Sequence, residues 1–119
     1  ASLFESGGAT LKSDGRRVIK ILSKELRKRL NKYELVIDVE GHTDDIPIRT
    51  SQFPSNWELS SSRAASVVKL FTERGIDPTV VRAIGHADAF PKKPNRDADG
   101  AAIPDNMAVN RRVDVIVHY

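Results

Sequence analysis

Asp44 and Arg63 have the chemistry and the spacing expected of a site that holds a ligand of mixed charge. Asp44 follows the end of a predicted strand, and Arg63 falls in the first turns of the next predicted helix. Backbone N–H groups at a helix N-terminus also favour an anion. A ligand with an ammonium and a carboxylate can therefore span the two side chains. The spacing equally allows Asp44 to cap its own loop and Arg63 simply to pair with it.

Two histidines offer a different chemistry, because the segment G-H-T-D at 41–44 is echoed by G-H-A-D at 85–88. Two His and two Asp at strand ends are ligands for zinc or manganese. The zinc-hydrolase motif, however, puts two His on one helical face with a Glu base, and the sequence lacks it. Because a strand-end His more often hydrogen-bonds the backbone, we expect neither His42 nor His86 to hold a metal. A metal-dependent hydrolase remains an alternative.

Other catalytic classes find little support. The chain has no cysteine, which excludes disulfides, thiolate metal sites and a Cys nucleophile. The serines at 60–62 precede a helix rather than sitting in a Gly-x-Ser-x-Gly elbow. The segment 97–100 resembles part of a calcium loop, but Asn106 stands where that loop needs a Glu. We expect no catalytic residue and no cofactor.

The elements that must position these residues follow from hydrophobic spacing. Apolar residues recur every three or four positions from Ser13 to Leu30 and again after position 59, which predicts two amphipathic helices. The second helix should begin between 59 and 61 and end at Gly75. Period-two alternation predicts strands at 35–41, 80–87 and 112–119, with a further short strand near Phe4. This order predicts an α/β two-layer sandwich, a mixed sheet of about four strands covered on one face by two main helices.

Individual side chains carry further expectations. We expect the first helix to bury Val18, among other apolar residues. The loop from Asp44 to Trp57 contains two prolines and is long enough to be functional. Trp57 should pin that loop to the core. Arg111 and Arg112 open the last strand, where alternation sends them to opposite sides, so one of them can reach Asp44.

The length of 119 residues predicts one domain, residues 1–119. Its basic charge is concentrated between positions 12 and 34, where nine Lys or Arg face three acids. Only Tyr33 accompanies these charges, so we expect no nucleic acid binding. A solvated helix face or a protein-docking surface using Lys20, Lys24 and Lys28 fits better. No run approaches the roughly 20 apolar residues of a membrane span. Because the sequence starts at Ala1 rather than Met, we expect a processed product or an excised domain.

The sequence resembles the OmpA-like peptidoglycan-binding domain over nearly its whole length. The residues that carry the resemblance are Phe4, Gly41-His42-Thr43-Asp44, Asn56, Leu59-Ser60, Arg63-Ala64, Gly75, Gly85, Pro91 and Asn110-Arg111-Arg112-Val113. The resemblance implies a periplasmic domain that binds the stem peptide of peptidoglycan non-covalently. It also implies that the ammonium of diaminopimelate binds Asp44 and its carboxylate binds Arg63. By the same resemblance Thr43, Asn56 and Leu59 line the groove, and Arg111 belongs to the site.

Within this family, the stretch from Asp45 to Leu59 is similar to the flagellar stator proteins. That similarity implies a domain that anchors a stator unit to the cell wall, with an inner-membrane helix in the N-terminal part that this sequence lacks. The implied partners are peptidoglycan, a stator channel subunit, a second copy of the chain in a homodimer and a flagellar ring protein. An outer-membrane protein or lipoprotein tether is the alternative. His86 and four extra loop residues depart from the usual family pattern.

Overall fold

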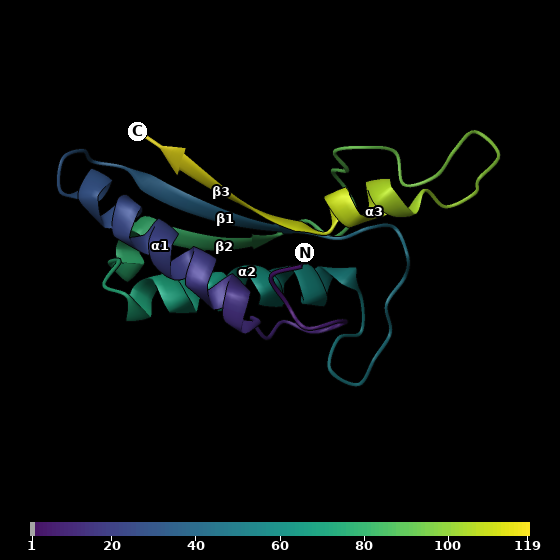
Figure 1. The fold of residues 1–119 in the computed structure, drawn as a ribbon, viewed down its shortest axis with the longest axis horizontal. Helices are drawn as coiled ribbons and strands as arrows, with labels where there is room; N and C mark the ends of the chain where they lie inside the picture. Colours follow the sequence, from purple (N-terminus) through teal and green to yellow (C-terminus); the bar gives the residue numbers. More distant parts are fainter. Residues whose placement is uncertain (1) are drawn as a thin grey trace.

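The computed structural model describes residues 2–119 and shows a three-stranded sheet with helices on one side (Figure 1). The elements are α1 (Ser13–Leu30), β1 (Val36–His42), α2 (Asn56–Glu73), the 3-10 helix η1 (Pro78–Val80), β2 (Val81–Gly85), α3 (Pro104–Asn110) and β3 (Arg112–His118). The strand order is β2-β1-β3, with β1 parallel to β2 and antiparallel to β3. The predicted α/β sandwich with a mixed sheet is confirmed.

The sheet has one strand fewer than expected. The N-terminal segment does not join it: Phe4 bridges Leu11, and Glu5 N–H donates to the Thr10 carbonyl at 2.9 Å. Gly7, with a φ of +64°, turns the chain back on itself between these contacts. Because the segment satisfies its backbone groups internally, it packs beside the helices as a folded loop instead of pairing with a strand.

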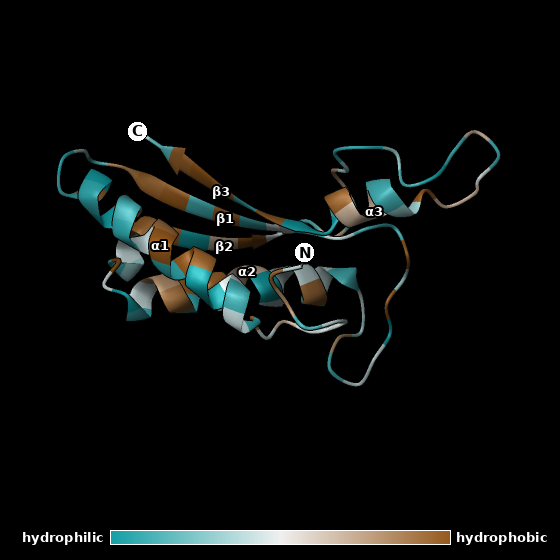
Figure 2. Ribbon diagram, in the orientation of Figure 1, coloured by the Kyte–Doolittle hydropathy of each residue, from teal (hydrophilic) through white to brown (hydrophobic). Residues whose placement is uncertain are grey.

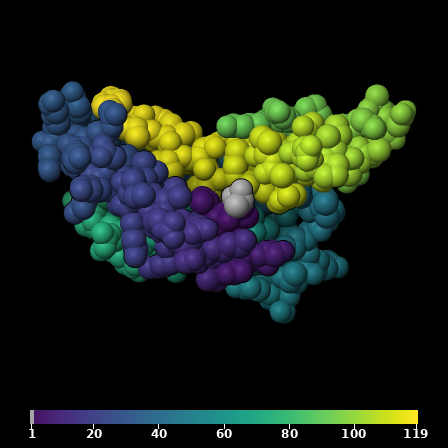
Figure 3. Space-filling model, in the orientation of Figure 1, coloured from purple at the N-terminus to yellow at the C-terminus, as the bar shows by residue number. Residues whose placement is uncertain are grey.

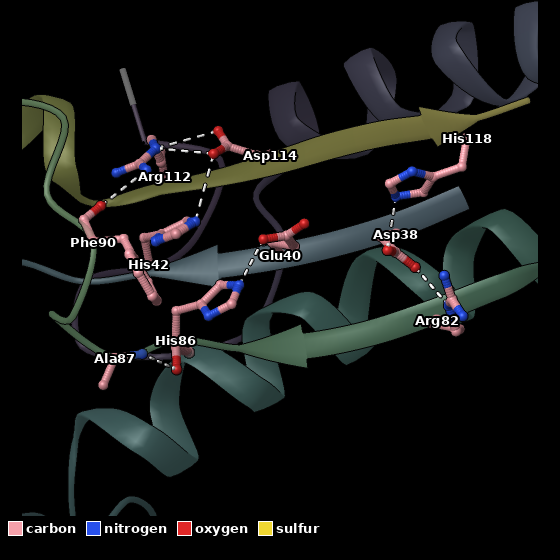
Figure 4. A network of polar contacts seen from close by, with 11 residues as sticks. Asp38, Glu40, His42, Arg82, His86, Ala87, Phe90, Arg112, Asp114 and His118 are labelled. Carbon is pink, nitrogen blue, oxygen red and sulfur yellow. Dashed lines mark hydrogen bonds and ion pairs between the residues drawn. The ribbon is translucent and has the colours of Figure 1, made fainter. Parts of the chain in front are cut away.

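Alternation along β1 divides the sheet into a buried and an open face. Ile37 and Val39 are fully buried in the core beneath the sheet. Asp38, Glu40 and His42, at the alternate positions, lie on the opposite face, which α1 and α2 do not cover (Figure 4). The strand thus carries a hydrophobic core on one side and a polar network on the other.

The two long helices supply the other layer of the core. Along α2, Ala64, Val67 and Phe71 have no exposed surface, and along α1 Leu26 is 2% exposed. Figure 2 shows apolar positions recurring along these helices and the strands, with polar turns of α1 toward solvent. The prediction that Val18 is buried is wrong, since it is 51% exposed. None of the helices in residues 2–119 is long and apolar enough to cross a bilayer.

Helix α2 packs closely on the ends of β1 and β2 because glycines face it there. A Cβ at Gly41 would collide with the backbone carbonyl of Ser60, and one at Gly85 would collide with Ser61. The hydroxyl of Ser60 also accepts a hydrogen bond from Ala87 N–H at 3.0 Å. These contacts fix the start of α2 against the edge of the sheet where both parallel strands end.

The helix α2 begins at Asn56, several residues earlier than predicted. Ser55 is its N-cap, and its hydroxyl accepts from Trp57 N–H at 3.2 Å and contacts Glu58 at 2.6 Å. The pattern Ser-x-x-Glu at 55–58 is a capping-box signal that explains the earlier start. Trp57 is consequently on the outer surface, 56% exposed, so the prediction that it pins the loop to the core is wrong. Phe53, which is 4% exposed, anchors the loop instead of Trp57.

The excursion between β2 and β3 ends in α3, which the sequence pattern did not predict. Asn110, at the end of α3, is fully buried: its side-chain oxygen accepts from Lys92 and Lys93 N–H, and its amide donates to Asn95. The rest of the excursion projects from the body of the molecule (Figure 3). Asn110 thereby fixes the base of this arm beside the start of β3.

Candidate functional site

A pocket of about 220 Å³ lies where β1 gives way to its loop, α2 begins and β3 starts. We call it the groove. It is lined by Gly7, Thr43, Asp44, Ile46, Pro47, Ile48, Asn56, Leu59, Arg63 and Arg111. The six residues that the sequence singled out, Thr43, Asp44, Asn56, Leu59, Arg63 and Arg111, are therefore all brought together in one place.

Asp44 is 7% exposed and has a partner for each carboxylate oxygen. Oδ1 accepts from Ile46 N–H at 3.0 Å, so the side chain caps the first turn of its own loop. Oδ2 accepts from Arg111 Nη1 at 2.7 Å. Within residues 2–119 the direct ion pair of Asp44 is with Arg111, and Arg63 is not part of it. One of the two arginines at the start of β3 thus reaches Asp44, as strand alternation allows.

Arg63 is held from the other side, by the N-terminal segment. Its Nε donates to the carbonyl of Gly8 at 2.8 Å, and its guanidinium lies 5.1 Å from the ring centre of Phe4. The residue is 8% exposed, yet its two terminal amino groups have no hydrogen-bond acceptor in the described part of the chain. These two groups are free to receive an oxygen-bearing ligand.

The charges of the groove do not balance. Burial and the nearby Arg111 both lower the pKa of Arg63, and Asp44 opposes them. A guanidinium nevertheless stays protonated in proteins, so two cations face one carboxylate. A buried charge without full compensation is costly, and an incoming carboxylate would relieve that cost. The groove is therefore suited to bind an anion.

The wall of the groove is part of the loop, held by a hydrogen bond from α2. The side-chain amide of Asn56 donates to the carbonyl of Ile46 at 3.0 Å, and Leu59 is 6% exposed beneath it. Farther along, Asp45 pairs with Arg96 of the projecting arm at 2.8 Å. Asn56 therefore ties the first turn of α2 to the loop that follows Asp44.

Sequence reasoning did not identify the N-terminal part of the site. Gly7 lines the groove, and Gly8 and Phe4 hold Arg63. The run Ser-Gly-Gly at 6–8 signals a turn, but local patterns do not say which distant side chain a turn will meet. The contact joins residues 55 positions apart.

The open face of the sheet carries a second polar cluster, drawn in Figure 4. Asp38 accepts from Arg82 at 2.6 Å and pairs with His118 at 2.9 Å. The hydrogen bond from Arg82 is the main cause that lowers the pKa of Asp38; burial opposes it and His118 adds to the lowering. On the same face Arg112 pairs with Asp114 at 3.1 Å. In this cluster the charged groups compensate one another.

The two histidines of the echoed G-H-x-D segments do meet on this face. The rings of His42 and His86 are stacked with centres 4.9 Å apart. Asp44 and Asp88 do not join them; instead His86 Nε2 lies 2.6 Å from an oxygen of Glu40. Burial lowers the pKa of His42, and the charge of Arg112 adds to the effect.

The basic stripe lies on the outer surface of α1. Lys20, Lys24 and Lys28 are all exposed, as a solvated helix face requires. A shallow hollow of about 650 Å³ beside it is lined in part by Lys24, Arg27 and Asp77. The stripe is remote in sequence from the groove, and no residue is shared between the linings of the two.

Known proteins with similar sequences match nearly the whole chain. Motility protein B of Bacillus subtilis is 35% identical over 115 residues, which is 96% of this chain and 41% of that protein. The uncharacterized protein YtxE of the same organism is 35% identical over 118 residues, or 98% of this chain and 45% of that protein. The chain thus spans less than half the length of these two relatives.

Solved structures and a family match agree with this result. The periplasmic domain of Helicobacter pylori MotB superposes with a TM-score of 0.81 at 27% identity, covering 97% of this chain and 69% of that one. The cell wall anchor of the type VI secretion system (T6SS) of Pseudomonas aeruginosa also gives 0.81, at 31% identity, covering 98% of this chain and 74% of that one. Residues 3–103 match the OmpA family. The chain therefore belongs to the OmpA family.

Proposed function

We propose that this chain binds peptidoglycan non-covalently and that the stem peptide enters the groove. The observation that carries the proposal is the convergence of all six residues on one pocket in which Arg63 has free amino groups. Membership of the OmpA family and similarity to a cell wall anchor support it. No bond is made or broken in this role, so we expect no catalysis.

The groove suits a zwitterionic group such as the free end of diaminopimelate. Its carboxylate would bind the amino groups of Arg63, and its ammonium would bind Asp44. Asp44 uses one lone pair on each oxygen for Ile46 and Arg111, and a carboxylate offers about four. Arg111 would then hold Asp44 in position rather than compete for it.

The affinity of a single groove should be modest. A hydrogen bond to a charged group contributes roughly 1.5–3 kcal/mol net, and the groove is open to water. Many copies on one polymer mesh would compensate by multivalency. A tether of this kind can be released and replaced, which a covalent link would not permit.

In its cellular setting we propose that the chain anchors a flagellar stator unit to the wall from the periplasm. The support is its similarity to Motility protein B and to MotB periplasmic domains, and the stator-like loop after Asp44. The inner-membrane helix, the channel subunit and dimer contacts would involve residues outside this sequence, with a flagellar ring as a further partner. Because a secretion-system anchor has an equally similar fold, an outer-membrane or secretion-system tether is the competing assignment.

The test is co-sedimentation with purified peptidoglycan sacculi. Asp44→Asn and Arg63→Ala should each lower binding by about tenfold or more, because each removes one charge-assisted contact. Asp38→Asn and Arg82→Ala are matched controls: they remove an equally close ion pair on the open face and should sediment like the parent. Circular dichroism checks that every variant is folded. Unchanged sedimentation of both groove variants would refute the zwitterion clamp.

A further inference from the structure

Three potential metal ligands meet on the open face where β1 and β2 end. Glu40 and His42 are alternate residues of β1, and His86 directly follows β2. One oxygen of Glu40 and one ring nitrogen of each histidine all lie within 4.8 Å of one another. Figure 4 shows the three side chains converging from the two neighbouring strands.

His42 is the least satisfied polar side chain of this group. It is 5% exposed, and its Nδ1 has no hydrogen-bond partner within residues 2–119. Its Nε2 lies 3.5 Å from Asp114, beyond the usual 2.7–3.2 Å range of N–H···O hydrogen bonds. A buried polar group without partners needs an explanation, and a bound ion supplies one.

Against the expectation from the sequence that neither histidine holds a metal, we propose that Glu40, His42 and His86 together bind one Zn²⁺ ion, independently of the groove. Two imidazoles and one carboxylate are a donor set that zinc accepts, with a fourth position for water or another ligand. If a metal binds the other ring nitrogen of His42, Asp114, which lies 3.5 Å from Nε2, would close to hydrogen-bond distance, as outer carboxylates do for metal-bound histidines.

The rearrangement that binding requires is small. Zinc–ligand distances of 2.0–2.2 Å place tetrahedral ligand atoms about 3.3 Å apart, so atoms now within 4.8 Å need only side-chain adjustments. His86 and Glu40 are partly exposed and can move, with side-chain exposures of 23% and 19%. The nearby cation Arg112 is already paired with Asp114, which reduces its repulsion of the metal.

The charge of the donor set also favours a cation. The carboxylate of Glu40 supplies one negative charge. An ion at this position would connect the ends of the two parallel strands, where His86 already contacts Glu40 at 2.6 Å and stacks on His42.

The experiment titrates the chain, first stripped with EDTA, with Zn²⁺ against a chromogenic chelator. We expect one equivalent to bind the parent, and Co²⁺ in its place to give the visible absorption of a four-coordinate site. His86→Ala and Glu40→Gln should weaken Zn²⁺ by more than about 100-fold, beyond the roughly 10–100-fold typical of outer-shell changes. Zinc should raise the Tm of the parent and not that of His86→Ala.

His118→Ala is the matched control, because His118 lies on the same face and also pairs with a carboxylate, Asp38. It should bind Zn²⁺ like the parent. The proposal is overturned if the parent binds no stoichiometric Zn²⁺ at micromolar concentration, if His86→Ala binds as well as the parent, or if His118→Ala loses binding equally. None of these readouts involves peptidoglycan, so the result is separate from that of the sedimentation test.

Discussion

The groove and the open face each contain a buried aspartate bonded to an arginine, and they differ in what surrounds that pair. Asp44 bonds Arg111 at 2.7 Å, and Asp38 bonds Arg82 at 2.6 Å. Asp38 has a second polar partner in His118, whose Nε2 lies 2.9 Å from Oδ2, whereas the groove has a surplus cation, Arg63. Similar ion pairs can therefore have different roles. On the open face the charges balance and the network stabilises the sheet, whereas in the groove one positive charge remains for a ligand.

The largest effect should come from Gly41→Ala, because Gly41 lies between the two regions. A Cβ there would collide with the backbone of Ser60 and push α2 away from the strand. We expect a loss of about 3 kcal/mol or more in unfolding free energy, measured by urea denaturation. Gly8→Ala is the control, since its nearest neighbour would be 3.7 Å away. Similar stabilities for the two variants would contradict this account of the packing.

An effect of intermediate size on stability should distinguish the Asp44–Arg111 ion pair from the Asp38–Arg82 ion pair. Arg111→Gln removes the cation that is bonded to Asp44 within residues 2–119. Because Asp44 is 7% exposed, we expect a loss of about 1–2 kcal/mol in unfolding free energy. Arg82→Gln should cost less than about 1 kcal/mol, because Asp38 keeps His118 and the Arg82 side chain is 60% exposed. Thermal and urea unfolding of both variants measure the difference. Equal losses would show that the second partner of Asp38 is of no consequence.

The smallest expected effect is a dependence of thermal stability on pH. The pKa of Asp38 is lowered, chiefly by its hydrogen bond from Arg82. A lowered carboxyl pKa contributes stability that is fully present above the ordinary value of about 3.9 and is lost as the pH falls through the folded-state value. In EDTA, the Tm of the parent should therefore drop more steeply below about pH 4 than that of Asp38→Asn. Parallel curves would rule out this role for Asp38.

Much of the fold could be predicted from local patterns. Period-two alternation in β1 gives its buried and open faces, and the spacing of Ala64, Val67 and Phe71 gives the inner side of α2. The first strand was over-predicted because a short apolar pair such as Leu3 and Phe4 does not say whether the segment will pair with the sheet or with itself. Whether the segment pairs with the sheet or with itself depends on where the backbone N–H and C=O groups of the rest of the fold lie.

The six candidate residues line one pocket, as expected, but the pairing among them was not predictable. Types and spacing brought Asp44 and Arg63 to one edge, but the choice of Arg111 over Arg63 as the partner of Asp44 depends on where Gly8 lies. Likewise, the echoed histidine segments pointed to two strand ends, but not to the contact between His86 and Glu40. The register between β1 and β2 decides which of their residues lie side by side. The sequence of neither strand alone determines that register.

The hydrogen bond between Arg63 and Gly8 has a mechanical consequence. If the chain is pulled from its N-terminal side while the groove holds the wall, the force passes from the segment before α1 directly to α2. Ser66, whose hydroxyl donates to the carbonyl of Ala9 at 2.5 Å, shares that load. On this route the load reaches α2 before it reaches the seven paired positions between β1 and β3.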